Sequence, residues 1–365
     1  MSLLFMEGFE TVGTVNDVCS ANIITGLTSR WDAVHTNSPG NSTVKLVGGQ
    51  RRGTALQFTG GVVELNKQFG SNQQTWIVGF GFRRDGDPPY GHSQILQVVE
   101  YNTRGGGGEQ ISLYIGGSGA ESGANSGKIM VYYAGTRYTT NMPSTTANTW
   151  YYIEVKTTIV NANTGTVEVR LNGVTAINAV NIDTSRTGNN YARGIVLCSH
   201  TLPWTCDNLY ICDGTGATNN NFLGQVSVEV HRPNGDGATQ EWTPSANVSH
   251  VTLVDNTVPI NFSDYVETDT VNQTELFTNN TWDMTTNIYG IQISADVRAT
   301  GSEAKKVQMV VEHTGNEVTA NTYFATGPNS QVQALGIAET VPGTSNAWTN
   351  SDLSAAQFGF RKAAL

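Results

Sequence analysis

The sequence is short of charged residues, and of basic residues in particular, which excludes several classes of partner. Only 14% of its 365 residues are charged, and 20 Lys and Arg stand against 30 Asp and Glu, giving a formal net charge of −10. An acidic surface repels the phosphates of nucleic acid, and no run of Lys and Arg offsets this excess. We therefore expect no nucleic-acid partner.

Long apolar runs are also missing. No stretch approaches the roughly 20 apolar residues that a membrane-spanning helix needs. The first residues, Met1 to Glu7, contain no basic residue, and Glu7 ends their short apolar run, unlike the core of a secretory signal. We expect a soluble chain with no membrane partner, made in a cytoplasm without a signal peptide.

Cysteines are few, and their spacing gives no familiar framework. The four are Cys19, Cys198, Cys206 and Cys212, with no Cys-x-x-Cys pair among them. The simplest interpretation is buried, reduced thiols that behave as small apolar residues. A zinc site that uses His200 with the three later cysteines is the alternative.

Glycine and period-two alternation are what the sequence has in abundance. It contains 40 Gly, scattered between short apolar runs. Alternation of apolar and polar residues is typical of half-buried strands, and short strands separated by turn residues are typical of sandwiches and barrels. The predicted class is all-β, and the clearest expected strands are Ala55–Phe58, Trp76–Phe82, Gln94–Val99, Ile111–Ile115, Lys128–Tyr133, Trp150–Lys156, Gly165–Leu171, Arg193–Cys198 and Thr205–Cys212.

A domain boundary is expected near residue 215. The segment 213–221 is a polar, turn-forming run, and an apparent new strand, Phe222–Val230, follows it. Two domains, 1–214 and 222–365 with a linker at about 215–221, are the economical interpretation. Further strands are expected at Thr285–Val297, Lys305–Glu312 and Gln357–Arg361.

A catalytic apparatus is not evident. Glycosidases with this kind of fold use Glu-x-Asp-x-x-Glu on one strand, and the nearest match, Glu267-Thr-Asp269, has Asn272 in place of the second Glu. Glu154 and Glu168 stand singly in their strands and are expected to face solvent. No Gly-x-Ser-x-Gly elbow occurs, and the six histidines are dispersed. We expect no enzyme activity.

Two kinds of ligand remain open. Asp85 and Asp87 are candidate calcium ligands, because a loop with two carboxylates offers hard oxygen donors, although Asp and Gly also simply form turns. Tyr90, Tyr101 and Tyr138 are candidate glycan contacts, because an exposed aromatic ring can stack on a sugar. The alternative is that aromatic residues fill the core.

Several segments of the first half resemble a concanavalin A-like, laminin-G-type jelly roll. Phe5–Glu10 resembles the first strand, which pairs beside the last, and Cys206–Gly214 resembles that closing strand. Gly53–Phe58 and Trp76–Phe82 resemble paired strands of such sandwiches. Trp150–Lys156 followed by Thr166–Gly173 resembles their most recognisable hairpin. The resemblance covers roughly residues 3–214.

The second half resembles a β domain that follows such a jelly roll in many virion proteins of tailed phages, and it implies a smaller β-sandwich. Its marks include Asn221–Val226, Glu241–Ser245 and Gln357–Phe360. The two-domain order implies a non-enzymatic bacteriophage structural protein at the virion surface. We expect capsid decoration, with the major capsid protein or other virion proteins as partners and a homotrimer as the assembly. A tail fibre or adhesin that binds a host glycan is the alternative.

Overall fold

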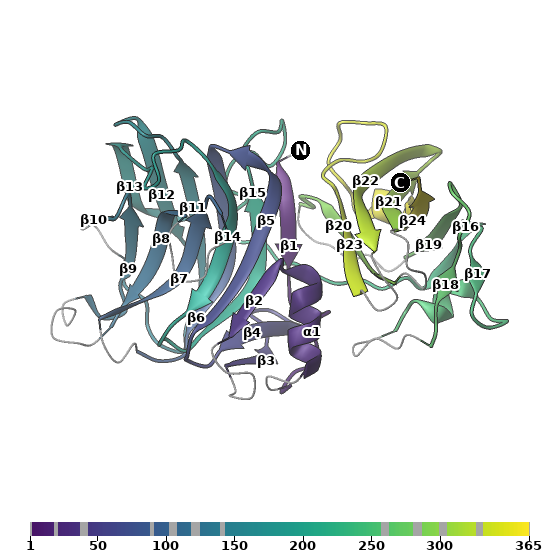
Figure 1. Ribbon diagram of the computed structural model, residues 1–365, viewed down its shortest axis with the longest axis horizontal. Coiled ribbons are helices and arrows are strands. Elements are labelled where there is room, and N and C mark those ends of the chain that lie inside the picture. Colours follow the sequence, from purple (N-terminus) through teal and green to yellow (C-terminus); the bar gives the residue numbers. More distant parts are fainter. Residues whose placement is uncertain are drawn as a thin grey trace. The chain divides into compact units, whose positions relative to one another are not determined.

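The structure is a computed structural model that describes residues 2–17, 21–36, 43–87, 91–101, 108–117, 125–138, 143–256, 263–279, 287–298, 305–325 and 331–364. The chain forms two compact units, Met1–Glu229 and Val230–Leu365. Antiparallel sheets dominate both units (Figure 1), which confirms the predicted all-β class. Within the described residues, no helix combines the length and apolar character needed to cross a bilayer.

The first unit contains two large antiparallel sheets. The eight-stranded sheet has the order β13-β12-β11-β6-β15-β4-β3, with β1 also paired to β15. Its strands are β1 (Leu3–Glu7), β3 (Val44–Gly48), β4 (Thr54–Phe58), β6 (Thr75–Arg84), β11 (Trp150–Thr158), β12 (Gly165–Leu171), β13 (Val174–Ile182) and β15 (Trp204–Cys212).

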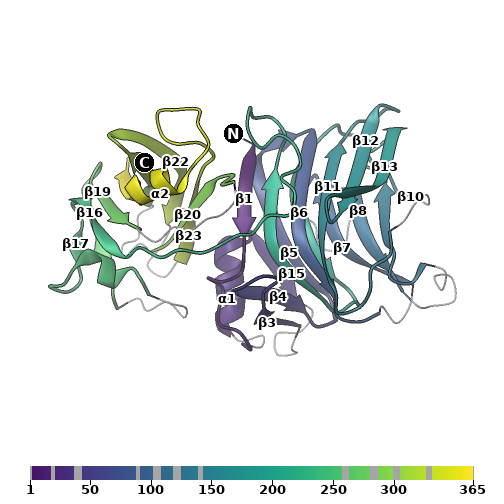
Figure 2. The same cartoon turned by 180° about the vertical axis from the view of Figure 1, so that it is seen from behind.

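The second large sheet has seven strands in the order β10-β9-β8-β7-β14-β5-β2. They are β2 (Ala33–Thr36), β5 (Val63–Gln73), β7 (His92–Val99), β8 (Glu109–Gly116), β9 (Ile129–Tyr133), β10 (Thr136–Tyr138) and β14 (Ala192–Ser199). The two sheets pack as the concanavalin A-like jelly-roll sandwich that the resemblance implies, and Figure 2 shows the same strands from behind.

Alternation along β6 builds the core between the sheets. Trp76, Phe80 and Phe82 face the core and are fully buried. Gly79 points to the other face, where a Cβ atom would lie 2.2 Å from Cε1 of Tyr210, so only glycine leaves room for that ring. Trp204 stacks on Phe58 with ring centroids 4.5 Å apart, and it extends the same core.

Sequence reasoning found the hairpin of β11 and β12 and the pairing of β1 with β15, and the structure confirms both. The turn after β12 uses Asn172 and Gly173, whose φ angles are 52° and 79°, as a tight hairpin turn requires. The resemblance implied that β4 and β6 pair with each other, and this expectation is wrong. Both pair with β15, which lies between them.

The helix α1 (Ala21–Arg30) was not predicted. Ile23 and Leu27 lie one turn apart on it, and both are fully buried. At its end, Arg30 donates a hydrogen bond from Nη1 to Oε1 of Glu7 at 2.7 Å, and both side chains are buried. The helix therefore anchors the first strand to its surroundings.

The expected strand Phe222–Val230 does not form. Residues Asn221–Glu229, which we call the strap, run without regular secondary structure and belong to the first unit. The reason is a set of specific contacts with the eight-stranded sheet. Leu223 N donates to Tyr210 Oη at 3.2 Å, and Val228 N donates to Asn208 Oδ1 at 2.8 Å. The division between the units thus falls after Glu229, later than the expected linker.

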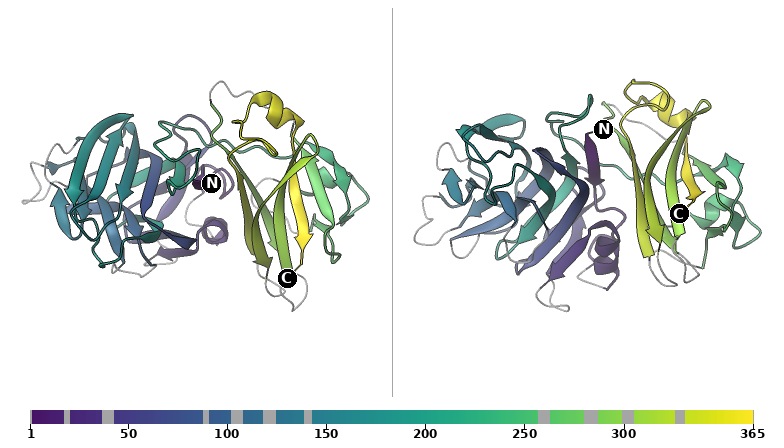
Figure 3. Two further views of the ribbon diagram at one scale, coloured as in Figure 1. Left: turned by 90° about the horizontal axis from the view of Figure 1, so that it is seen from above. Right: turned by 45° about the horizontal axis from the view of Figure 1, so that its top comes forward.

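The second unit contains a five-stranded sheet of order β16-β19-β24-β21-β22 and two-stranded sheets β17-β18 and β20-β23 (Figure 3). Its elements are β16 (Gly235–Gln240), β17 (Thr243–Pro244), the 3-10 helix η2 (His250–Leu253), β18 (Val266–Glu267), β19 (Thr274–Thr278), β20 (Ile291–Arg298), β21 (Lys305–His313), β22 (Asn316–Ala325), β23 (Gln331–Ala338), α2 (Asn350–Ala355) and β24 (Gln357–Ala363).

The predicted strands Lys305–Glu312 and Gln357–Arg361 are confirmed as β21 and β24. The strand expected from Thr285 begins only at Ile291 among the described residues. Trp348 belongs to one core cluster of this unit and donates from Nε1 to the Ala338 carbonyl at 3.1 Å.

Candidate binding face of the seven-stranded sheet

One row of side chains crosses all seven strands of the second large sheet. Cross-strand register places residues in line from β2 to β10, and we call this set the cross-strand row: Ala33, Asn66, Val196, Gln97, Ser112, Tyr132 and Arg137. Residues paired directly across strands project to the same face. The row therefore occupies one face of the sheet.

The neighbouring row settles which face this is. One residue along each strand from the cross-strand row lies a second row in register, and all its members are fully buried: Leu65, Leu197, Leu96, Leu113 and Val131. Side chains alternate between faces along a strand, so this second row fills the core of the sandwich. The cross-strand row lies on the opposite, outer face of the sheet.

Three aromatic rings gather near one end of this face. The ring centroids of Tyr114 and Tyr132 are 4.7 Å apart, and His92 packs edge-on to Tyr114 at 4.8 Å. His92 also stacks on Tyr132 at 5.5 Å. Burial, with a smaller contribution from the positive charge of Arg137, lowers the pKa of His92. Burial raises the pKa of Tyr114 to about 12. Burial thus favours the neutral forms of His92 and Tyr114.

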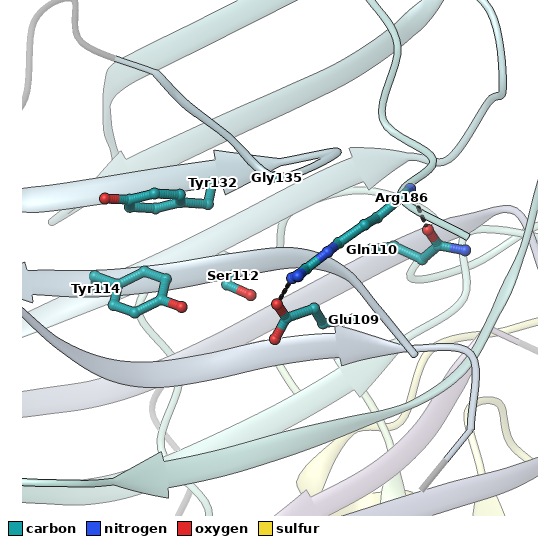
Figure 4. Close-up of a pocket in the computed structure, with 7 residues that line it drawn as sticks. All are labelled: Glu109, Gln110, Ser112, Tyr114, Tyr132, Gly135 and Arg186. Atoms are coloured by element: carbon teal, nitrogen blue, oxygen red, sulfur yellow. Dashed lines mark hydrogen bonds and ion pairs between the residues drawn. The ribbon is translucent and has the colours of Figure 1, made fainter. Parts of the chain in front are cut away.

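A pocket of about 230 Å³ opens beside these rings. Figure 4 shows its lining, with Tyr114 and Tyr132 neighbouring each other on one side and the charged residues on the other. Arg186 forms an ion pair with Glu109, and Nε2 of Gln94 donates to Oε2 of Glu109 at 3.4 Å. The lining residues are Glu109, Gln110, Ser112, Tyr114, Tyr132, Gly135 and Arg186.

Gln110 fixes the loop that forms one wall of the pocket. Its Oε1 accepts a hydrogen bond from the backbone N of Arg186 at 2.7 Å. Its Nε2 donates to Oγ1 of Thr187 at 2.8 Å and to the carbonyl of Tyr191 at 3.1 Å. The amide is 1% exposed, so these bonds are protected from water. The pocket wall is accordingly built before any ligand arrives.

The candidate calcium ligands lie elsewhere. Asp85 accepts hydrogen bonds from Arg83 Nε at 2.6 Å and from Gln57 Nε2 at 2.7 Å. Thr205 Oγ1 also donates to Asp85, and Asp87 forms an ion pair with Arg84. Both carboxylates thus serve as acceptors for protein donors. Among the described residues, no three His, Cys, Asp or Glu side chains are grouped so that they could hold a metal ion.

The candidate glycan residues are scattered. Tyr90 lies outside the described residues. Tyr101 is 44% exposed and follows β7, and Tyr138 lies on β10, where its Oη reaches the Asn178 carbonyl at 3.5 Å. The aromatic cluster of His92, Tyr114 and Tyr132 was missed. The sequence contained a sign of it, because Ser112 and Tyr114 alternate with the core residues Ile111, Leu113 and Ile115 on a strand that was correctly predicted.

The three described cysteines and the strand carboxylate Glu154 are buried. Cys198, Cys206 and Cys212 are free, buried thiols, as predicted, and Cys19 lies outside the described residues.

The expectation that Glu154 faces solvent is wrong. It is fully buried beneath the strap, and its Oε1 accepts from Tyr210 Oη at 2.6 Å and from Gly224 N at 2.9 Å.

Glu168 is partly exposed and is held by protein donors. Arg170 Nε donates to Glu168 Oε1 at 2.9 Å, and Thr175 Oγ1 donates to the same oxygen at 2.7 Å. Although partial burial acts to raise it, these hydrogen bonds and the charge of Arg170 leave the pKa of Glu168 below its ordinary value. A carboxylate held ionised in this way is poorly suited to donating a proton.

Two further acids, Glu10 and Asp207, lie where β1 ends beside β15. Burial raises the pKa of Glu10 to about 8 and that of Asp207 to about 7. Asp207 Oδ2 accepts from Gln50 N at 2.6 Å, whereas Glu10 Oε2 is buried without a hydrogen-bond partner. Protonation of these acids relieves the cost of burying their charge.

Comparisons with known proteins identify no family. No family profile and no curated protein sequence matches this chain. Among solved structures, an endo-β-1,4-glucuronan lyase from Trichoderma reesei is 15% identical over 57% of this chain and 95% of its own, with a TM-score of 0.40. The PL-14 alginate lyase from Aplysia kurodai is 12% identical over 58% and 99%, with a TM-score of 0.41.

The globular domain of T. cruzi calreticulin is also similar, at 10% identity over 58% of this chain and 88% of its own, with a TM-score of 0.36. Similarities at this level describe a fold and carry nothing about activity. The first unit of this chain is a concanavalin A-like jelly-roll sandwich, and a smaller, additional β unit follows it.

Proposed function

We propose that this chain is a non-enzymatic structural protein of a bacteriophage particle and that it decorates the outer surface of the capsid. The resemblance of its two β units, in this order, to tailed-phage virion proteins supports the phage assignment. One observation supports binding rather than catalysis. The strand carboxylates Glu109, Glu154 and Glu168 are each engaged by protein donors. A general acid and its partner must instead be available to a substrate.

Immunogold electron microscopy of intact particles tests the decorating role. Antibodies raised against the recombinant chain should label the capsid surface at many points. The major capsid protein and other virion proteins are the expected partners, and a homotrimer is the expected assembly. Label confined to the tail, or absent from the particle, would contradict decoration.

An activity assay tests the non-enzymatic part separately. The purified chain should release neither new reducing ends nor unsaturated products from acidic and neutral polysaccharides. Release that disappears in a Glu109→Gln variant would show that the pocket performs chemistry, and this part of the proposal would then fail.

A second candidate function is a receptor-binding adhesin of the tail. The cluster of His92, Tyr114 and Tyr132 favours it, because three packed aromatic rings beside a polar pocket provide a platform for a sugar ring. In that case, immunogold label should lie on the tail, and the isolated chain should bind a glycan.

A further inference from the structure

We propose that the strap is a pH-sensitive latch. Its C-terminal half, Val226–Glu229, is held on the eight-stranded sheet at acidic and neutral pH, and it is released at mildly alkaline pH, when the carboxyl groups of Glu10 and Asp207 ionise beside it. This inference concerns a conformational change of the first unit and goes beyond a role in capsid structure. It rests on the contacts of the strap, on buried oxygen atoms without a partner and on the charges around the two acids.

The C-terminal half of the strap is held by single contacts and not by a strand ladder. Val228 N donates to the side-chain oxygen Oδ1 of Asn208 at 2.8 Å. Arg52 Nη2 lies 3.5 Å from Glu229 Oε1, but the Arg52 side chain is 78% exposed, so solvent weakens this ion pair. A segment held in this way opens at a lower cost in free energy than a strand paired within a sheet.

The carboxyl group of Glu10 is enclosed where the strap passes the end of β1. Its Oε1 accepts from Thr54 N at 3.4 Å, whereas its Oε2 is buried without a hydrogen-bond partner. A Cβ atom on Gly8 would lie 2.3 Å from this Oε2 and 3.1 Å from the carbonyl oxygen of Val228. The carboxyl oxygen and the strap carbonyl therefore border the same small space. A carboxylate charge there would repel the negative end of the carbonyl dipole.

Asp207 lies next to the residue that accepts the strap. Its Oδ2 accepts from Gln50 N at 2.6 Å, and its Oδ1 accepts from the backbone N of Asn208 at 2.7 Å. Gln50 Oε1 is also buried without a hydrogen-bond partner. Burial, together with repulsion from neighbouring acids, raises the pKa of Glu10 to about 8 and that of Asp207 to about 7. Both acids therefore ionise between mildly acidic and mildly alkaline pH.

The charges of the surrounding elements do not offset this ionisation. Glu7, on β1, repels the negative charge of both acids. Within the described part of the chain, no basic side chain forms an ion pair with Glu10 or Asp207. The other charged groups here have partners of their own: Glu7 with Arg30, Glu229 with Arg52, Asp32 with Lys67, and Arg51 with the Ser227 hydroxyl.

Opening of the strap is the least costly way to hydrate the two carboxylates. A buried charge without a counter-ion requires water. The strands β1, β4 and β15 are fixed in one sheet, and the loop between β3 and β4 is closed by a bond from Gly49 N to the Gly53 carbonyl at 3.1 Å. The strap has no regular secondary structure that must break first. Its release also lengthens the free chain that leads to the second unit.

Hydrogen–deuterium exchange of the full chain tests the latch, with protection factors corrected for the intrinsic pH dependence of exchange. Each pH unit above a raised pKa favours the open, ionised form by about tenfold for each acid, so protection of Val226–Glu229 should fall by about tenfold or more between pH 6 and pH 9. Strands β6 and β11 should stay protected. Glu10→Gln, which stays neutral, should keep the strap protected at pH 9, and Asp207→Asn should reduce the fall.

The matched control is Glu168→Gln, which removes a partly exposed carboxylate of β12 whose pKa lies below its ordinary value. Because Glu168 is ionised throughout this pH range, the response of the strap should be unchanged. Equal protection of the strap at pH 6 and pH 9, or a fall that neither Glu10→Gln nor Asp207→Asn reduces, would overturn the proposal. An equal loss of protection in β6 and β11 would also overturn it, because the whole unit would then be unfolding.

Discussion

Glu10 is partly buried and Asp207 is buried, and their protonation links the stability of the first unit to pH. Burial raises the pKa of Glu10 from 4.5 to about 8 and that of Asp207 from 3.8 to about 7. An acid whose pKa is higher in the folded state stabilises the fold most fully below its unfolded pKa. That contribution is lost as pH rises through the folded pKa. Stability should therefore decline from mildly acidic to alkaline pH.

We expect the free energy of unfolding of the first unit to fall between pH 5 and pH 9, by on the order of 3 kcal/mol. Glu10→Gln should remove much of this dependence, because the amide stays neutral. Chemical denaturation at pH 5, 7 and 9 measures the effect, with Glu267→Gln, an exposed acid of the second unit, as the control. Stability that is constant or rises over this range would refute the assignment.

Single residues differ in how far the sequence alone predicts them. Asn172 and Gly173 act locally, because an Asn-Gly dipeptide is by itself typical of the tight turn that they form. Glu154 was mispredicted because the segment that buries it was assigned to another domain. Glu10 and Asp207 are 197 positions apart in the chain, and only the pairing of β1 with β15 brings their segments together. Such environments depend on tertiary register, which alternation within one strand does not specify.

At the scale of elements, the strap completes the first unit. Its backbone N–H groups donate to Glu154 Oε1, Tyr210 Oη and Asn208 Oδ1 on the outer face of the eight-stranded sheet. The guanidinium of Arg170 lies 4.1 Å from the ring centroid of Phe222, which adds a cation–π contact. The jelly roll therefore extends to Glu229 and needs the strap to cover a buried acid.

Truncation tests this view of the strap. A chain of residues 1–229 should melt at a temperature roughly 10 °C higher than a chain of residues 1–214, since loss of the strap leaves buried polar groups without partners and costs about 3 kcal/mol. Thermal unfolding followed by circular dichroism measures the difference. Equal melting temperatures would show that the strap lies on the surface without stabilising it.

Strands were predicted better than their partners. Alternation located most strands of the first unit because one face of each is buried in the sandwich. It missed α1, whose apolar residues are too few to stand out from the strands around it. The cross-strand row was also beyond reach, because it requires the register of seven strands at once. A site assembled across a sheet is not visible in any single strand.

At the scale of the whole molecule, the two units have separate cores. The core cluster around Trp348 consists of residues of the second unit alone. Calorimetry of the full chain should consequently show two transitions. Trp348→Ala should lower only one of them, with a loss of about 3–5 kcal/mol in that unit, because it removes a buried ring. A single transition that shifts as a whole would contradict independent unfolding.

The central claim is that the chain is a structural component of a phage particle, and a cryo-EM map of the intact particle tests it most directly. The account predicts density for both β units repeated over the capsid surface at its symmetry axes, in contact with the major capsid protein. Density confined to the tail would contradict decoration and support the adhesin alternative. A particle map with no place for the chain would contradict the claim itself.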